Sequence, residues 1–260
     1  MLRVFLVLSL LMAASLVQAD DAKKIAASAS FAEAIVAKFS NTRDEAELAK
    51  ADSAIEKAWQ DYIRYHATNN ELGKELALIR ARSASSKRDK KRVASAWETA
   101  LQLQPLTINS MTRLNLNVQA ANASAAAGDY SAANRYFSAA QTYAFLQDRD
   151  TRALQLNLKI NELRALGPQM EWRRLRDNLL DMRLFSEGFS LWTLPRLEAL
   201  VSEAEMRVAL QPEDKGKREA LGELKSKIQL TMKNMSNILT APYVNRVRNF
   251  YYTIEDYYGL

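Results

Sequence analysis

Residues that favour the α-helix dominate this sequence, and they constrain the fold more than any single motif. Long tracts are rich in alanine, leucine, glutamate, lysine and arginine, whereas the 260 residues include only 7 glycines and 5 prolines. These five abundant residue types have high helix propensity. No convincing run of alternating β-branched residues, the pattern of a half-buried strand, interrupts them. The sequence therefore predicts an all-α protein.

The stretch from Asn122 to Phe145 has the most interpretable spacing. Small residues before Gly128 predict a helix that a neighbouring backbone can approach closely, and Gly128 can take the left-handed conformation that ends it. A second helix then carries an apolar face with spacings of three and four, made of Tyr130, Ala133, Phe137 and Ala140. One hairpin cannot bury that face alone, so we expect antiparallel helical hairpins stacked as a repeat-like array or an elongated bundle.

This glycine, aromatic, small, aromatic, alanine order resembles the second half of a tetratricopeptide repeat (TPR). Upstream, Trp97, Ala100 and Pro105 resemble the close of a preceding repeat, and the match covers about one helical hairpin. The interval from Pro105 to Gly128 departs from the ~34-residue period of that family, so the likeness is to a degenerate repeat. The alternative is an unrelated helical hairpin that packs in the same way. The resemblance implies protein or peptide binding and no chemistry.

Apolar stripes predict further helices. Residues 44–66 carry a long stripe, and the spacing over 221–238 is close to a heptad seam that packs inside the chain or against another copy. The C-terminal stretch predicts a short helix with Val247, Phe250 (or Tyr251), Ile254 and Tyr257 (or Tyr258) towards the core. In the helix expected to open the part after Gly167–Pro168, the apolar face is Trp172, Leu175, Leu179, Met182 and Phe185, or Phe189 in place of the last.

The first 19 residues have the pattern of a secretory signal peptide. Arg3 precedes an apolar run from Val4 to Val17, and the residues that follow resemble a cleavage site. The run is shorter than the roughly 20 apolar residues that span a bilayer, so we expect cleavage before Asp20 rather than an anchor. We expect an exported protein, most simply in a bacterial periplasm, with secretion as the alternative.

The sequence contains no cysteine, so an exported chain of this kind depends on its hydrophobic core rather than on disulfides. Gly167–Pro168 is a clear helix stop and the best candidate for a boundary between parts of the chain. We expect a repeat-like helical part over residues 20–167 and a C-terminal helical part over 168–260, packed as one continuous unit.

Two basic segments and the aromatic C-terminus are candidate binding surfaces. Residues 80–92 contain seven basic residues and a single acid, and such a run can bind phosphates, anionic lipid head groups or an acidic partner. The basic helix after Trp172 can lie on a membrane surface or grip a partner. The C-terminal tyrosines cannot all face the core, and exposed tyrosines are favoured contact residues. The candidates are Arg80, Arg82, Lys87, Arg88, Lys90, Lys91, Arg92, Arg173, Arg174, Arg176, Tyr251, Tyr252, Tyr257 and Tyr258. Each segment also has an alternative interpretation. Residues 80–92 can be a solvated turn, the basic helix can be the outer helix of a bundle, and the C-terminal stretch can be a capping helix.

The sequence lacks the residues that most classes of enzyme need. The only histidine, His66, lies in a polar stretch, and we interpret it as a surface residue. No glycine-rich phosphate loop is present, and we predict no metal site and no cofactor. A glycosidase needs a carboxyl group whose pKa is raised by apolar surroundings, and Glu187, between two phenylalanines, is the only candidate for that role.

The sequence thus predicts a non-enzymatic exported scaffold or adaptor that binds a protein or peptide partner in the cell envelope, or a second copy of the chain. One alternative is a cell-wall glycan-cleaving enzyme with Glu187 as its acid. The other is a binder of anionic surfaces, lipid or polymer, that acts through the basic helical segments. We expect no nucleic-acid partner, because no aromatic stacking residues are interleaved with the basic run, and no transmembrane segment after signal cleavage.

Overall fold

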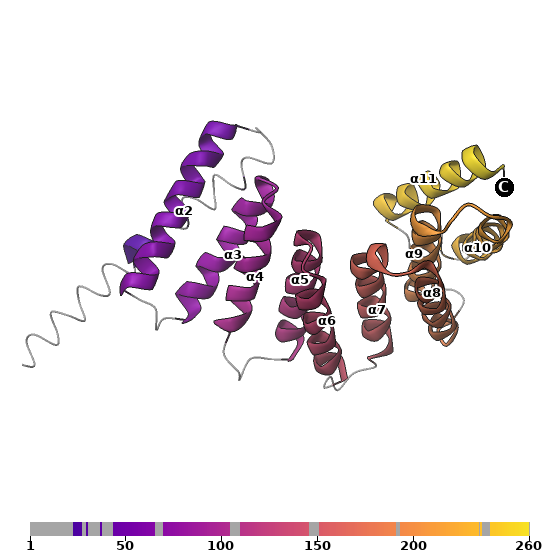
Figure 1. The fold of residues 1–260 in the computed structure, drawn as a ribbon, viewed down its shortest axis with the longest axis horizontal. Coiled ribbons are helices and arrows are strands. Elements are labelled where there is room, and N and C mark those ends of the chain that lie inside the picture. Colours follow the sequence, from indigo (N-terminus) through magenta and orange to yellow (C-terminus); the bar gives the residue numbers. More distant parts are fainter. Residues whose placement is uncertain are drawn as a thin grey trace, which may run out of the picture. The chain divides into compact units, whose positions relative to one another are not determined.

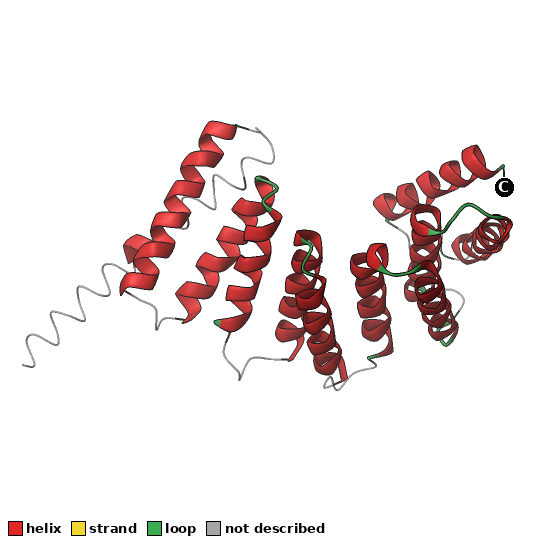
Figure 2. Ribbon diagram, viewed as in Figure 1, coloured by secondary structure: helices red, strands yellow, loops and turns green. Residues whose placement is uncertain are grey.

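The computed structural model describes residues 23–27, 30, 37, 44–65, 70–104, 110–145, 151–190, 193–233, 235 and 240–259. The expected signal peptide and His66 lie outside the described residues. Every regular element of the described part is helical, and none is a strand (Figures 1 and 2). The all-α prediction is therefore confirmed. None of the described helices is both long enough and apolar enough to pass through a bilayer.

The helices are joined in sequence by short connections. Their bounds are α2 (Glu45–Tyr65), α3 (Asn70–Ser86), α4 (Lys90–Gln102), α5 (Ser110–Ala127), α6 (Tyr130–Phe145), α7 (Arg152–Leu166), a 3₁₀ turn η1 (Gly167–Gln169), α8 (Trp172–Glu187), α9 (Leu194–Leu210), α10 (Lys215–Lys233) and α11 (Ala241–Tyr258). Helices packed together are mostly neighbours in sequence, such as α3 with α4 and α9 with α10. This is the arrangement expected of stacked antiparallel hairpins.

The chain divides by its contacts into two units, Met1–Tyr136 and Phe137–Leu260. The division falls inside α6, upstream of the Gly167–Pro168 stop at which the sequence suggested a boundary. Gly167 lies at a packed turn within the second unit, because a Cβ atom there would lie 3.3 Å from the side chain of Leu175. The chain therefore folds back at Gly167 to pack α8 against α7.

In the first unit, α2 buries the stripe predicted for residues 44–66. Leu48, Ile55 and Tyr62 are almost fully buried, and they form one core cluster with residues of α3 such as Leu76. Tyr62 crosses to α3 at Gly73, where an added Cβ would collide with the tyrosine hydroxyl. Glycine at this position therefore allows the close approach of the two helices.

The turn between α5 and α6 has the predicted form. Gly128 is left-handed, with φ of +88°. The N–H group of Asp129 donates to the carbonyl of Ser124 at 2.9 Å, which closes the end of α5. The carboxylate of Asp129 then accepts from the N–H of Ala132 at 2.9 Å and caps α6. On the predicted face of α6, Ala133, Phe137 and Ala140 are buried.

Two core clusters lie in the second unit. One joins α7 and α8 to one side of α9, and the other joins α9 to α10 and α11. The heptad-like seam of α10 packs inside the chain, since Leu221, Leu224 and Ile228 are fully buried in the second cluster. Of the residues predicted for the core of α11, Val247, Phe250 and Ile254 are buried there too. The sequence left two candidates for the last position of the α8 face, and the structure distinguishes them: Phe189 packs against the core, whereas Phe185 is 41% exposed.

Candidate functional site

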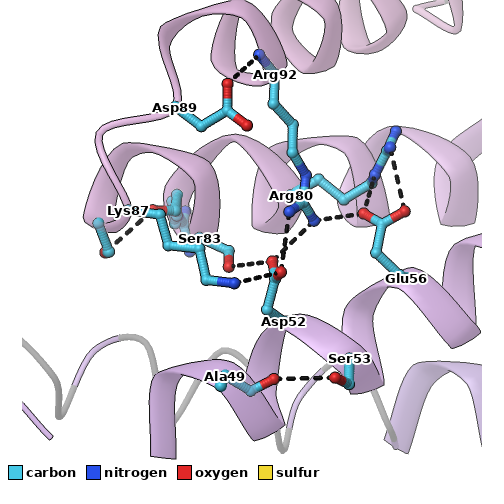
Figure 3. A network of polar contacts seen from close by, with 11 residues as sticks. Ala49, Asp52, Ser53, Glu56, Arg80, Ser83, Lys87, Asp89 and Arg92 are labelled. Atoms are coloured by element: carbon cyan, nitrogen blue, oxygen red, sulfur yellow. Dashed lines mark hydrogen bonds and ion pairs between the residues drawn. The ribbon is translucent and has the colours of Figure 1, made fainter. Parts of the chain in front are cut away.

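The basic run over residues 80–92 is held by two acids of α2 that the sequence analysis did not single out. Asp52 and Glu56 lie one turn apart and face α3 and α4 (Figure 3). Arg80 Nε donates to Glu56 Oε1 at 2.9 Å, and Lys87 Nζ donates to Asp52 Oδ2 at 2.6 Å. Arg92 reaches both carboxylates, with a distance of 3.0 Å from its NH1 atom to Asp52 Oδ2. Arg80, Lys87 and Arg92 are thus engaged in ion pairs within the protein.

The charge of Asp52 gives this network a role in stabilising the fold. Burial of the Asp52 carboxyl raises its pKa, but hydrogen bonds from Arg92, Lys87 and Ser83 outweigh that effect and lower the pKa to about 2. Asp52 is therefore ionised at any physiological pH. Because it binds side chains of both α3 and α4, it ties three helices of the first unit together.

The remaining four basic residues of the run, Arg82, Arg88, Lys90 and Lys91, are exposed. Arg88 has a left-handed backbone, with φ of +59°, and Asp89 caps α4 by accepting from the N–H of Arg92 at 3.1 Å. Lys90 and Lys91 then occupy the first turn of α4. A positive charge is unfavourable there, because the helix dipole already places partial positive charge at that end.

The arginines of the second basic segment differ in their ion pairing. Arg173 and Arg174 are exposed, whereas Arg176 pairs with its neighbour Asp177 at 2.9 Å. Among the C-terminal tyrosines, Tyr252 is 56% exposed. Tyr251 is half-buried against Phe250, and burial raises its pKa to about 12. The side chains of Tyr257 and Tyr258 lie outside the described residues.

The structure adds a site that the sequence did not indicate. A pocket of about 240 Å³ opens where the C-terminal part of α6 meets α7 and α8, and all of its lining residues belong to the second unit. We call it the α6–α8 groove; its lining residues are Gln141, Gln155, Leu156, Lys159, Asp181, Met182 and Phe185. Three of these side chains, Leu156, Met182 and Phe185, are apolar. The other four carry the polar groups of the groove.

Most polar groups of the groove are already bound to residues beside it. Lys159 Nζ donates to Asn178 Oδ1 at 2.8 Å, and Gln141 Nε2 donates to Glu162 Oε2 at 3.2 Å. Asp181 differs from them, because no ion pair or hydrogen bond joins its exposed carboxylate to any other described residue. The groove therefore presents apolar walls and one unpaired negative charge.

The apolar surface extends beyond the groove along α8. Leu184 is 54% exposed and Leu180 is 39% exposed, next to the partly exposed ring of Phe185. Contiguous apolar surface of this kind marks interaction sites more often than singly scattered apolar residues do. The ring of Phe185 is held on one side by Phe189, with the ring centroids 6.3 Å apart in an edge-on arrangement.

Glu187, the acid considered for catalysis, does not belong to this groove. Asp181 is the one carboxylate among its lining residues, and Glu187 is an exposed residue at the end of α8 that does not line it. Within the described residues, no group of three or more histidine, cysteine, aspartate or glutamate side chains could hold a metal ion.

A scan of the sequence against protein-family models gives no match, and searches of curated proteins and of solved structures give none either.

Proposed function

We propose that the protein is a non-enzymatic scaffold or adaptor, and that its α6–α8 groove holds an apolar side chain of a peptide segment from its partner. The observation that carries this proposal is the apolar pocket beside the exposed ring of Phe185. Pockets for drug-sized ligands and cofactors hold roughly 300–1,000 Å³. A pocket of about 240 Å³ suits one or two side chains better than a whole cofactor.

The sequence patterns support the same class of function. The Gly128 hairpin resembles part of a tetratricopeptide repeat, a family that binds proteins and peptides through stacked helices. The signal-like first 19 residues favour export, so we place the partner in the cell envelope, most simply in a periplasm. The unpaired carboxylate of Asp181 favours a partner segment with a lysine or arginine near its apolar anchor.

A glycan-cleaving enzyme is less well supported. Canonical glycosidases use two carboxyl groups about 5–9.5 Å apart on either side of the scissile bond. The α6–α8 groove offers Asp181 alone, and Glu187 lies outside it. A Glu187→Gln variant that lost a glycan-cleaving activity of the wild-type protein, with its fold intact, would revive this alternative.

One observation favours a second candidate function, the binding of anionic surfaces. Arg88, Lys90 and Lys91 are exposed at one turn, and no acid within the described residues forms an ion pair with them. Binding through these residues would weaken steeply with salt, because exposed charges are screened over ~8–10 Å at physiological ionic strength. Retention on anionic vesicles that did not change with salt would argue against this function.

The peptide-binding proposal is tested by selecting displayed peptides on the protein and measuring their affinity for two variants. Phe185→Ala removes the exposed ring of the groove, and Leu194→Ala is the control because it removes a 50% exposed side chain that does not line it. Loss of the apolar contact should weaken binding by about tenfold in Phe185→Ala and leave Leu194→Ala unchanged. Equal affinities in both variants, or no selectable peptide, would contradict the proposal.

A further inference from the structure

A second groove lies between α9 and α11 in the second unit. It encloses about 510 Å³ and is lined by Glu205, Val208, Pro242, Asn245, Arg246, Asn249, Phe250 and Thr253. We call it the α9–α11 groove. It shares no lining residue with the α6–α8 groove.

The charges at this groove neutralise each other, because two arginines, Arg246 and Arg164, pair with two acids, Glu198 and Glu205. Arg246 Nε donates to Glu205 Oε1 at 2.6 Å, and its NH2 atom donates to Glu205 Oε2 at 2.6 Å. Its NH1 atom binds both carboxylate oxygens of Glu198 at 3.0 Å. Two-pronged pairs of this kind are among the strongest polar contacts in proteins. The guanidinium group is therefore fully used in fixing α11 to α9, and it leaves no unpaired charge for a ligand.

The unused polar groups are the side-chain amides of Asn245 and Asn249. Both residues are exposed, and neither amide has a hydrogen-bond partner among the described residues. They are four residues apart on α11, so they stand in one row along the groove. Each asparagine amide offers a carbonyl acceptor and two N–H donors. One such side chain can therefore bind both the N–H and the C=O group of a single peptide residue.

The spacing of the row matches an extended polypeptide. Four residues of an α-helix rise about 6.0 Å. Two residues of an extended chain span about 6.6–6.8 Å, and alternate residues present their main-chain groups on the same side. Asn245 and Asn249 can thus engage residues n and n+2 of one strand-like segment with small side-chain adjustments.

We propose that the α9–α11 groove binds the main chain of an extended peptide segment, held at alternate residues by Asn245 and Asn249. A groove with compensated charges and two free amides is complementary to a neutral peptide backbone and not to a charged ligand. The apolar wall at Val208 and Phe250 then contacts the side chain between the two held residues. The inference stands independently of the α6–α8 groove, because the two sites use different residues.

The test uses nuclear magnetic resonance of the ¹⁵N-labelled protein. The probe is a heptapeptide of threonine, valine and serine, acetylated at its N-terminus and amidated at its C-terminus. This probe is uncharged and favours extended conformations. We expect the side-chain NH₂ signals of Asn245 and Asn249 to shift on titration to millimolar peptide. The same peptide methylated on every backbone nitrogen lacks the N–H donors, and it should leave both signals unmoved.

Variants distinguish recognition of the peptide main chain from a general effect on folding or binding. Asn249→Leu removes the amide at similar size from an exposed position, and it should weaken binding by about tenfold with an unchanged unfolding midpoint. Arg248→Ala, an exposed neighbour that does not line the groove, should bind as the wild-type protein does. Phe185→Ala should also retain binding, which separates this site from the α6–α8 groove. No shift of the two asparagine signals, or equal binding of the methylated peptide, would overturn the inference.

Discussion

Replacing Asp52 by asparagine should destabilise the first unit, because the carboxylate holds α3 and α4 to α2. The hydrogen bonds from Arg92, Lys87 and Ser83 lower the pKa of Asp52 from 3.8 to about 2 despite its burial. A difference of that size between folded and unfolded states corresponds to ~2.5 kcal/mol. Solvent still screens part of the site, so we expect Asp52→Asn to lower the free energy of unfolding by about 1–1.5 kcal/mol at pH 7.

The pH dependence gives the sharper assay. The folded pKa lies below the unfolded value, so the stabilisation is present above about pH 4 and is lost as the pH falls towards 2. Urea unfolding at pH 7, 4, 3 and 2.5 should show a difference between the wild-type and Asp52→Asn proteins that shrinks steadily below pH 4. Asp61→Asn, on the same helix but without an ion pair among the described residues, is the control and should have no such effect. Equal midpoints at pH 7, or a difference at pH 2.5 as large as that at pH 7, would refute the reasoning.

Three other substitutions test the packing and the charges. Gly73→Ala should lower the free energy of unfolding by about 1–3 kcal/mol, since the added methyl group collides with Tyr62; an unchanged denaturation midpoint would mean that the helices can separate freely. Lys91→Glu should raise it by about 0.3–1 kcal/mol in low salt, because it reverses an unfavourable charge in the first turn of α4, and the gain should fade in high salt. Arg246→Ala should lower the free energy of unfolding by about 1–2 kcal/mol, because Glu198 and Glu205 lose their two-pronged partner and keep only Arg164, and a loss below 0.5 kcal/mol on chemical denaturation would show that the pairs are not formed.

Helix positions and core faces followed from local patterns. The stripe on α2 and the seam on α10 are buried where the apolar spacing placed them. Gly128 ends α5 in the left-handed conformation that its position predicted. These features depend on residues within a few turns of one another, so periodicity and capping rules are sufficient to find them.

The sites were hidden because they depend on distant residues. The partners of the basic run lie on α2, 24 to 40 residues away in the sequence, and isolated acids there gave no local signal. Phe185 and Phe189 were equal candidates for the core because both suit the apolar face of α8. The pair Asn245 and Asn249 was visible as a spacing of four, but only the position of α9 makes it part of a groove.

The most direct test of the peptide-binding account is the methyl spectrum of the methionines in the presence of a selected peptide. Met182 lies in the wall of the α6–α8 groove, so its ¹³C-labelled methyl signal reports on what enters the pocket. The account predicts that this signal shifts in proportion to peptide occupancy and that Phe185→Ala reduces the shift at equal peptide concentration. A bound peptide that leaves the Met182 signal in place would contradict the account, because the pocket would then not be where the partner is held.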